Sequence, residues 1–358
     1  MPEGFLLSRI LFRFEDESED LLGDLSAVTI TPDGSLWVGS DELLGIERLY
    51  PIEPHIFGNH QHFPLGNFVE LFDSEDEIDI EGIEYSHHYL WITGSHSTKR
   101  KKAKGKNAEK DIQRLSQIKA DSNRYLLARI PVINGELVKV CSNPDDPTEK
   151  LTAACLQKTS KGNLLIDALT EDSHLGSIIS CSLPSKDNGL DIEGLTVFKN
   201  RIFLGLRGPV LRGWAIILEL ELVESEPGVL TLKEIGESGE LYKKHFVDLD
   251  GLGVRELCFY GEDLIVLGGP TMALDGALRV FRWKNALQHS GDSICGQDSG
   301  ELEVLFDLPI KVGTDYAEGL ALFPCLQYPD SLLVVYDSPD EIRKPRPKEI
   351  FADVFRLI

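Results

Sequence analysis

The feature that most constrains the fold of this chain is a phrase of two short strands that recurs six times. In the clearest copies an acidic residue, Glu and Gly open an apolar first strand, and a short polar turn leads to a strongly apolar second strand. The clear copies begin at Asp79, Asp191 and Tyr316, looser ones at Asp24 and Gly253, and the weakest occupies residues 152–168. A repeat of this kind determines the architecture before any local pattern does.

The period of the phrase predicts an all-β fold, a six-bladed β-propeller. The copies recur at a mean interval of about 58 residues, which suits four strands per blade with long outer loops. Residues 8–14 and 353–358 also have strand patterns, and pairing the N-terminal strand with the C-terminal blade would close the ring and cover an exposed edge. A sandwich or solenoid of similar hairpins is the alternative. The third positions of the six copies are Ser26, Glu81, Ala154, Glu193, Arg255 and Glu318.

Composition predicts one acidic cytoplasmic domain that spans residues 1–358. The net charge of −23 repels nucleic acid and anionic membranes and favours cations. The first residues lack the basic and apolar regions of a secretory signal, and no apolar run approaches the roughly 18 residues of a membrane span. The six cysteines are scattered without a Cys-x-x-Cys pair, which favours neither a disulfide framework nor a zinc cage.

A basic insertion, residues 98–120, separates the second and third copies of the phrase. It is rich in lysine and arginine, and its residues 108–118 have a weak helical pattern. One interpretation is a solvated, mobile loop. The other is a lid that brings positive charge over an anionic ligand.

Propeller geometry converts the repeat into a candidate site. The first strand of each blade lines the channel and the second returns antiparallel, so the start of one and the end of the other reach the same rim. Glu81, Glu193 and Glu318 should therefore converge near the axis, with Arg255 at the matching position of the fifth copy. The same rim should receive the ends of the second strands and the acids two positions before the glutamates, which are Asp41, His96, Arg207, Asp337, Asp79 and Asp191.

Three carboxylates around a narrow channel need compensation from an arginine, from a cation or from a raised pKa. Hard oxygen ligands favour calcium or magnesium, which predicts a metal site at Glu81, Glu193 and Glu318. The alternative is a structural network of glutamate and arginine that fixes neighbouring blades. Weaker candidates are the His-x-His pair at His60 and the pair of Ser95 and His96, which lacks a recognisable orienting acid.

Several of these motifs resemble a bacterial family known as domain of unknown function 3616. The resemblance rests on Asp-Ile-Glu-Gly at 79–82 and 191–194, Gly-Ser-His-Ser at 94–97, the Arg-Gly-Pro run within 206–215, and residues 245–253. The Glu-Gly-Leu phrase more loosely resembles the propellers of esterase-like phytases and calcium-dependent lactonases, which implies a metal at the channel mouth. Ser26, Ala154 and Arg255 depart from that pattern, since an acid is expected there.

The residues and the resemblance together predict a metal-dependent hydrolase that acts on a small anionic phosphate or ester substrate. In this hypothesis Arg207 and Arg255 clamp the anion and His96 is the general acid or base, with no organic cofactor. The further ligand-binding residues are Arg212, Asp41, Asp337 and Ser95. The alternative is a propeller that binds a small anion or a protein partner without catalysis.

Overall fold

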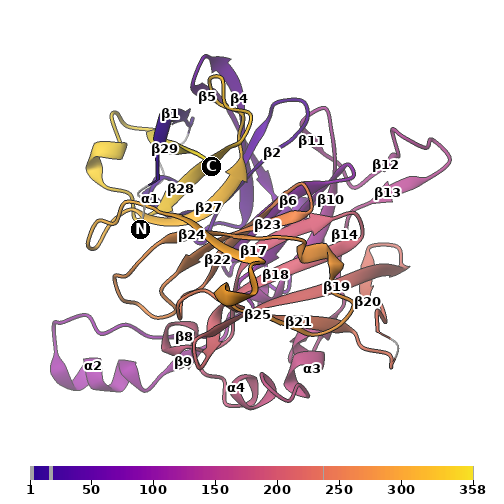
Figure 1. Cartoon of the computed structure of the whole chain (residues 1–358), viewed down its shortest axis with the longest axis vertical. Coiled ribbons are helices and arrows are strands. Elements are labelled where there is room, and N and C mark those ends of the chain that lie inside the picture. Colours follow the sequence, from indigo (N-terminus) through magenta and orange to yellow (C-terminus); the bar gives the residue numbers. More distant parts are fainter. Residues whose placement is uncertain (1–3, 16–18, 237, 358) are drawn as a thin grey trace.

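The computed structural model describes residues 4–15, 19–236 and 238–357, and strands dominate it (Figure 1). Five four-stranded antiparallel units follow one another in the described chain. The first comprises β2 (Leu25–Ile30), β3 (Leu36–Ser40), β4 (Gly45–Glu53) and β5 (Ile56–Pro64), and the second β6 (Ile80–Ser86), β7 (Tyr89–Gly94), β10 (Leu127–Ile133) and β14 (Ala154–Leu156). The third comprises β17 (Asp191–Phe198), β18 (Arg201–Leu211), β19 (Trp214–Glu226) and β21 (Tyr242–Asp248).

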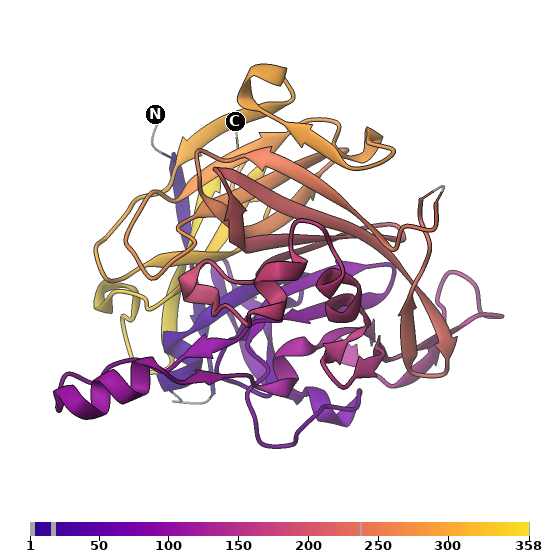
Figure 2. The same cartoon turned by 90° about the horizontal axis from the view of Figure 1, so that it is seen from below.

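The fourth unit comprises β22 (Gly253–Tyr260), β23 (Asp263–Gly269), β24 (Arg279–Trp283) and β26 (Leu302–Asp307), and the fifth β27 (Tyr316–Leu322), β28 (Ser331–Asp337), β29 (Glu349–Arg356) and β1 (Leu6–Arg13). Their first strands meet in a cycle, in which β2 contacts β6, β6 contacts β17, β17 contacts β22, β22 contacts β27 and β27 contacts β2. Figure 2 shows the units arranged around these inner strands. The fold is therefore all-β and propeller-like.

The repeated phrase forms the inner hairpin of all five units. In each hairpin the register shifts at the third position of the phrase, so that Ser26, Glu81, Glu193, Arg255 and Glu318 have no directly paired partner on the second strand. Such a β-bulge bends the strand and re-aims the side chain of the extra residue. The phrase thus specifies a bulge in addition to a pair of strands.

The glycine that follows the glutamate in the phrase allows neighbouring inner strands to approach closely. A Cβ atom on Gly82 would lie 2.5 Å from the Cβ of Leu195, and one on Gly194 would lie 2.9 Å from the Cγ of Leu257. Since Leu195 and Leu257 belong to the next inner strands of the cycle, a larger residue at either glycine would push the units apart.

The weakest copy of the phrase is not a unit of its own, and the prediction of six blades is not confirmed. Its first strand is β14, which pairs with β10 of the second unit. Its second segment begins helix α3 (Leu164–Thr170), where a strand was expected. Asn163 caps this helix by accepting a hydrogen bond from the Ile166 N–H. A short apolar run does not distinguish a strand from a buried helix, so the cap decided the structure here.

The N-terminal strand β1 pairs antiparallel with β29 and lies parallel to the start of β5, so it joins the last unit to the first. Ion pairs between Arg9 and Asp353 and between Arg13 and Glu349 accompany the pairing. The aromatic side chain of Phe12 is fully buried in the core and contacts Phe57 edge-on.

The basic insertion is an ordered excursion of the second unit. Strands β8 (Lys99–Arg100) and β9 (Ile118–Lys119) pair with each other, and helix α2 (Ala108–Leu115) extends from them away from the body (Figure 1). The helix confirms the weak helical pattern at 108–118. Asn107 caps it and none of its side chains is buried.

The remaining elements are short. They are α1 (Glu19–Gly23), α4 (Gly176–Ser180), β11 (Glu136–Leu137), β12 (Val140–Ser142), β13 (Lys150–Thr152), β15 (Lys158–Thr159), β16 (Gly162–Asn163), β20 (Val229–Leu232) and β25 (Ser293–Cys295). None of the helices among the described residues has the length and apolar character needed to cross a bilayer.

Replacement of Phe12 tests how much the N-terminal strand contributes to the fold. We expect Phe12→Ala to lower the free energy of unfolding by about 3–5 kcal/mol, because it removes a fully buried ring and leaves a cavity. Leu6→Ala, in the same strand but 43% exposed, should change it by less than about 0.5 kcal/mol. Equilibrium urea denaturation measures both, and equal effects would contradict the assigned position of β1.

Candidate functional site

The inner hairpins bring a group of acidic residues to one rim of the molecule. There they line a pocket of about 600 Å³. Its acidic floor consists of Asp41, Asp79, Glu81, Asp191, Glu193, Glu318 and Asp337. We call this cavity the acid pocket. The convergence of Glu81, Glu193 and Glu318 follows from their equivalent bulges, and Asp41 and Asp337 arrive from the ends of the second strands.

Three buried arginines bind part of the floor. The Nη1 atom of Arg255 lies 3.1 Å from Glu193 Oε2 and 2.6 Å from Glu318 Oε1, so Arg255 bridges two of the three glutamates. Arg207 forms an ion pair with Glu193 and lies 3.1 Å from Asp191. These contacts realise the glutamate–arginine network that the sequence left as an alternative to a metal site.

The third arginine, Arg124, is buried and holds Asp79 through two contacts of 2.7 and 2.8 Å. It also donates a hydrogen bond to the Ser97 hydroxyl at 2.9 Å. Sequence reasoning missed Arg124, because it lies in a short turn outside the repeated phrase. Asp79 and Asp191, in contrast, could be assigned to the rim from the sequence, because each precedes a floor glutamate by two positions.

Carboxyl groups outnumber arginines in the floor, and the excess raises several pKa values. Burial, with the nearby charges of Asp79, Glu318 and Asp337, raises the pKa of Asp41 to about 9. Burial and Asp337 raise the pKa of Glu318 to about 8, although Arg255 opposes the shift. Burial raises the pKa of Asp191 to about 7 and that of Glu81 well above its ordinary value. Near neutral pH the floor therefore retains protons.

Three floor carboxyl groups, those of Asp41, Glu81 and Asp337, form no ion pair with an arginine of the described ranges, and Asp337 accepts a hydrogen bond from the Ser338 hydroxyl at 2.9 Å. Glu81 forms no hydrogen bond or ion pair with any residue in the described ranges. The Oδ1 atom of Asp41 is buried without a hydrogen-bond partner among them. Both groups line the cavity and are available to a ligand.

The lining of the acid pocket also contains basic side chains. Side chains from the insertion line it, and we call them the basic cover: Lys99, Arg100, Lys101, Lys102, Arg114 and Lys119. Lys99 and Lys119 are anchored by Asp121 at 3.3 and 2.5 Å, and Arg100 by Asp187 at 2.8 Å. Lys101, Lys102 and Arg114 form no ion pair within 4 Å with a described carboxylate, although Lys101 donates a hydrogen bond to Gln117 and Arg114 donates one to the Lys102 carbonyl.

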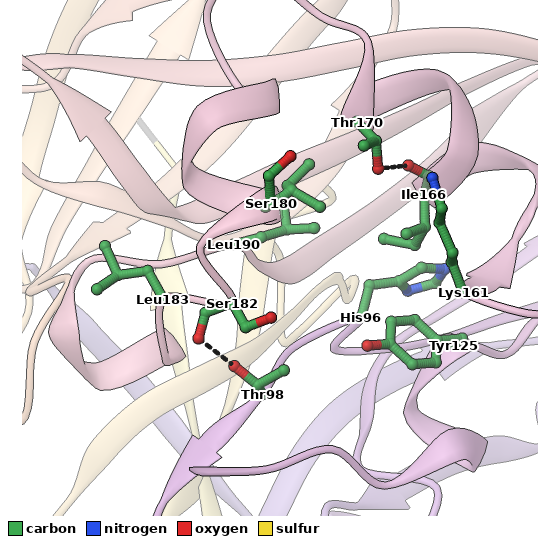
Figure 3. A pocket seen from close by; sticks show the side chains of 11 residues that line it. His96, Thr98, Tyr125, Lys161, Ile166, Thr170, Ser180, Ser182, Leu183 and Leu190 are labelled. Carbon is green, nitrogen blue, oxygen red and sulfur yellow. Dashed lines mark hydrogen bonds between the residues drawn. The ribbon is translucent and has the colours of Figure 1, made fainter. Parts of the chain in front are cut away.

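His96, predicted as the general acid or base, lines a different cavity (Figure 3). It is buried in a left-handed backbone conformation, with Nδ1 bonded to the Gly94 carbonyl and Nε2 accepting from the Asn163 amide, both within 2.9 Å. Burial lowers its pKa to about 4, so the ring stays neutral at physiological pH. Ser95 is also buried, and its hydroxyl hydrogen-bonds to Ser97 at 2.9 Å.

Arg212, predicted to bind the ligand, is exposed in the turn between β18 and β19 and does not line the acid pocket. Asp41 and Asp337 line it, as does Arg207. Arg255 does not line it but holds two residues that do. The structure thus assembles seven of the ten predicted side chains, and separates His96, Ser95 and Arg212 from them.

The predicted metal ligands do not form a metal site as they stand. Arg255 lies between Glu193 and Glu318, and positive charge occupies the position that a cation would need. Within the described ranges no three histidine, cysteine, aspartate or glutamate side chains are grouped as a metal ion requires.

Solved structures with distant similarity to this chain cover almost its whole length. Virginiamycin B lyase from Staphylococcus aureus is 9% identical with a TM-score of 0.35, and the match covers 98% of this chain and 99% of that one. A luciferin-regenerating enzyme is 9% identical with a TM-score of 0.39, covering 98% and 96%. Similarity at this level carries no argument about the fold or the function of this chain.

The fold and the rim site together define a propeller-like protein with a charged pocket at the mouth of its inner strands. A family model described as "Protein of unknown function (DUF3616)" matches residues 24–353. The chain belongs to this family, which agrees with the resemblance of its motifs. No curated protein matches the chain.

Replacement of Asp41 tests the excess of carboxyl groups through the pH dependence of stability. A carboxyl whose pKa is raised on folding stabilises the folded state at low pH, and this contribution is lost as the pH rises through the folded pKa. The pKa of Asp41 rises from 3.8 to about 9, so the loss extends over that whole interval.

We therefore expect Asp41→Asn to flatten the decline in unfolding free energy between acidic pH and pH 9. At the upper end it should be more stable than the parent by at least about 1 kcal/mol. Asp298→Asn, at an exposed position, is the matched control. Denaturant melts across the pH range measure the effect, and parallel curves for parent and Asp41→Asn would contradict it.

Proposed function

We propose that the acid pocket binds a small anionic molecule and that the protein hydrolyses a phosphate or ester bond in it. The observation that carries this proposal is that one cavity is lined both by the carboxyl groups of the floor and by the cationic side chains of the basic cover. Carboxyl groups with pKa values raised into the neutral range cluster at catalytic sites, because they can donate protons at physiological pH.

The basic cover supplies the binding of the anion. Lys101, Lys102 and Arg114 face the pocket without carboxylate partners, and cationic side chains form charge-assisted hydrogen bonds with phosphate or carboxylate oxygens. When the basic cover holds the anionic group of the substrate, the phosphate or ester bond next to that group lies over the floor. The cover thus orients the substrate, and the floor contacts the leaving group.

Glu318 is the proposed proton donor. Its side chain lines the pocket and its pKa is raised to about 8, so it carries a proton at neutral pH. The neighbouring Glu193 is held by ion pairs with Arg207 and Arg255. Protonation of a leaving alkoxide oxygen by such a group contributes about 10²–10⁴ to the rate of hydrolysis.

A divalent cation, the cofactor expected from the sequence, is the competing form of this proposal. Calcium or magnesium would have to displace protons from the floor, where Asp41, Glu81 and Asp337 are the carboxyl groups that no arginine of the described ranges holds. The reaction is therefore proposed without a step at a metal. Measurement in chelator and in millimolar calcium or magnesium separates the two forms.

Hydrolysis of alkyl substrates tests the role of Glu318. We expect Glu318→Gln to lower kcat for alkyl phosphates, alkyl esters or lactones by at least about 100-fold, with a smaller loss for p-nitrophenyl analogues whose leaving group needs no proton. The parent rate should fall above about pH 8, since Glu318 then loses its proton. The exposed Glu226→Gln is the control.

Equal losses on both substrate types would contradict proton donation by Glu318. A rate that requires added calcium or magnesium, and loses that response in Glu81→Gln, would favour the metal-dependent form instead. Binding without turnover of any substrate would favour the non-catalytic alternative, in which the same pocket holds a small anion and the protruding helix α2 offers exposed Ile112 and Leu115 to a protein partner.

The basic cover is tested with inorganic phosphate as the probe. We expect phosphate to raise the melting temperature of the parent, and Lys101→Gln combined with Lys102→Gln to weaken phosphate binding roughly three- to tenfold, as expected for exposed ionic contacts. Lys104→Gln with Lys106→Gln removes the same charge from the same insertion outside the pocket lining. If both double variants behave alike, the insertion attracts anions only through its net charge.

A further inference from the structure

A second cavity of about 380 Å³ lies behind one wall of the acid pocket. We call it the helix pocket, because residues of α3 and α4 cover it. Figure 3 shows Lys161 and Tyr125 on one side and Ser182 and Leu183 on the other. Neighbouring residues of one segment divide the two cavities, since Ser97 lines the acid pocket whereas His96 and Thr98 line the helix pocket.

The body of the helix pocket is apolar. Ile166, Ile179, Leu183 and Leu190 line it together with the ring of Tyr125. Ligand pockets are typically several hundred cubic ångströms in volume and predominantly apolar, with a few polar groups that fix orientation. The size and lining therefore suit a small molecule with a hydrocarbon body.

The polar groups of this lining favour an anion. No aspartate or glutamate is among them, although the chain carries 59 such residues and a net charge of −23. Lys161 is the one cation of the lining, and its ammonium forms no ion pair with a described residue. The hydroxyls of Tyr125, Ser180 and Ser182 also have no hydrogen-bond partner in the described ranges.

The walls of the helix pocket are held by a buried amide. Asn163 caps α3 through its carbonyl oxygen, while its amide nitrogen donates to His96 Nε2 at 2.8 Å and to the Tyr125 carbonyl at 2.7 Å. This one side chain fixes the helix, the imidazole and the tyrosine relative to one another. The arrangement accounts for the buried His96 that the acid pocket does not use, since a neutral imidazole serves here as a wall.

We propose that the helix pocket binds a small amphipathic anion, a medium-chain or aromatic carboxylate. Its hydrocarbon body lies between Ile166, Ile179 and Leu190, and its carboxylate meets the ammonium of Lys161. The site is distinct from the acid pocket in chemistry, because its lining carries no carboxyl group that would repel the ligand.

Calorimetric titration with octanoate tests this site, with octylamine as a probe of equal length and opposite charge. We expect octanoate to bind and octylamine not to bind. Lys161→Met should weaken octanoate binding roughly three- to tenfold, as expected for a partly exposed charged contact. Lys161 is exposed, so its replacement should leave the fold intact, and Lys139→Met at another exposed position is the matched control.

A second variant locates the bound molecule. Ser180→Phe places a ring at the edge of the helix pocket and should abolish octanoate binding, while its melting curve reports whether the fold is kept. Absence of heat at millimolar octanoate, equal binding of octylamine, or unchanged binding in both Lys161→Met and Ser180→Phe would each overturn the proposal.

Discussion

The chemistry of this molecule depends on a β-bulge that recurs at the same position of five inner hairpins. The bulge leaves the third residue of the repeated phrase without a directly paired partner, and so its side chain is free to turn toward the rim. Glycine at the next position of three copies keeps the neighbouring inner strand close. One local backbone feature therefore explains both the tight packing of the units and the convergence of Glu81, Glu193 and Glu318.

That convergence creates an electrostatic problem that the arginines solve only in part. Two unit charges about 5 Å apart repel by roughly 3 kcal/mol at an effective dielectric of about 20. Arg255 and Arg207 bridge the most buried glutamate to its neighbours, and truncation of such a buried partner costs about 3–5 kcal/mol because it leaves a charge uncompensated. The pKa values of Asp41, Asp191 and Glu318 are raised to between about 7 and 9, which makes these groups suited to proton transfer.

Much of this arrangement could be predicted from the sequence. The repeat located five hairpins, because strand pairs bounded by turns are local and the same signal is present several times. It also located the floor residues, since equivalent positions in equivalent units meet at the axis. The prediction of a strand pair at 152–168 was wrong for its second segment. An apolar run of that length fits a strand or a helix, and only the cap at Asn163 selects the helix.

The site residues that sequence reasoning missed or misplaced lie outside the repeat or at its edge. Arg124 reaches Asp79 from a turn whose position depends on long-range packing, which no periodicity encodes. His96 lies two residues beyond the end of β7, where the strand alternation has ended. Its left-handed backbone turns the ring away from the rim and into the helix pocket. A pattern of alternating faces holds only while the backbone remains extended.

The opposite charges of the floor and the cover resolve an apparent conflict between an acidic protein and an anionic ligand. At physiological ionic strength the charges of distant carboxylates are screened over about 8 Å, so a ligand at the rim responds chiefly to the side chains nearest to it. Those are the lysines and arginines of the insertion that line the pocket, whereas the pKa of the floor residue Glu318 is raised to about 8. Local charge rather than net charge thus selects the ligand, and the basic insertion is what makes an anion acceptable to a chain with a net charge of −23.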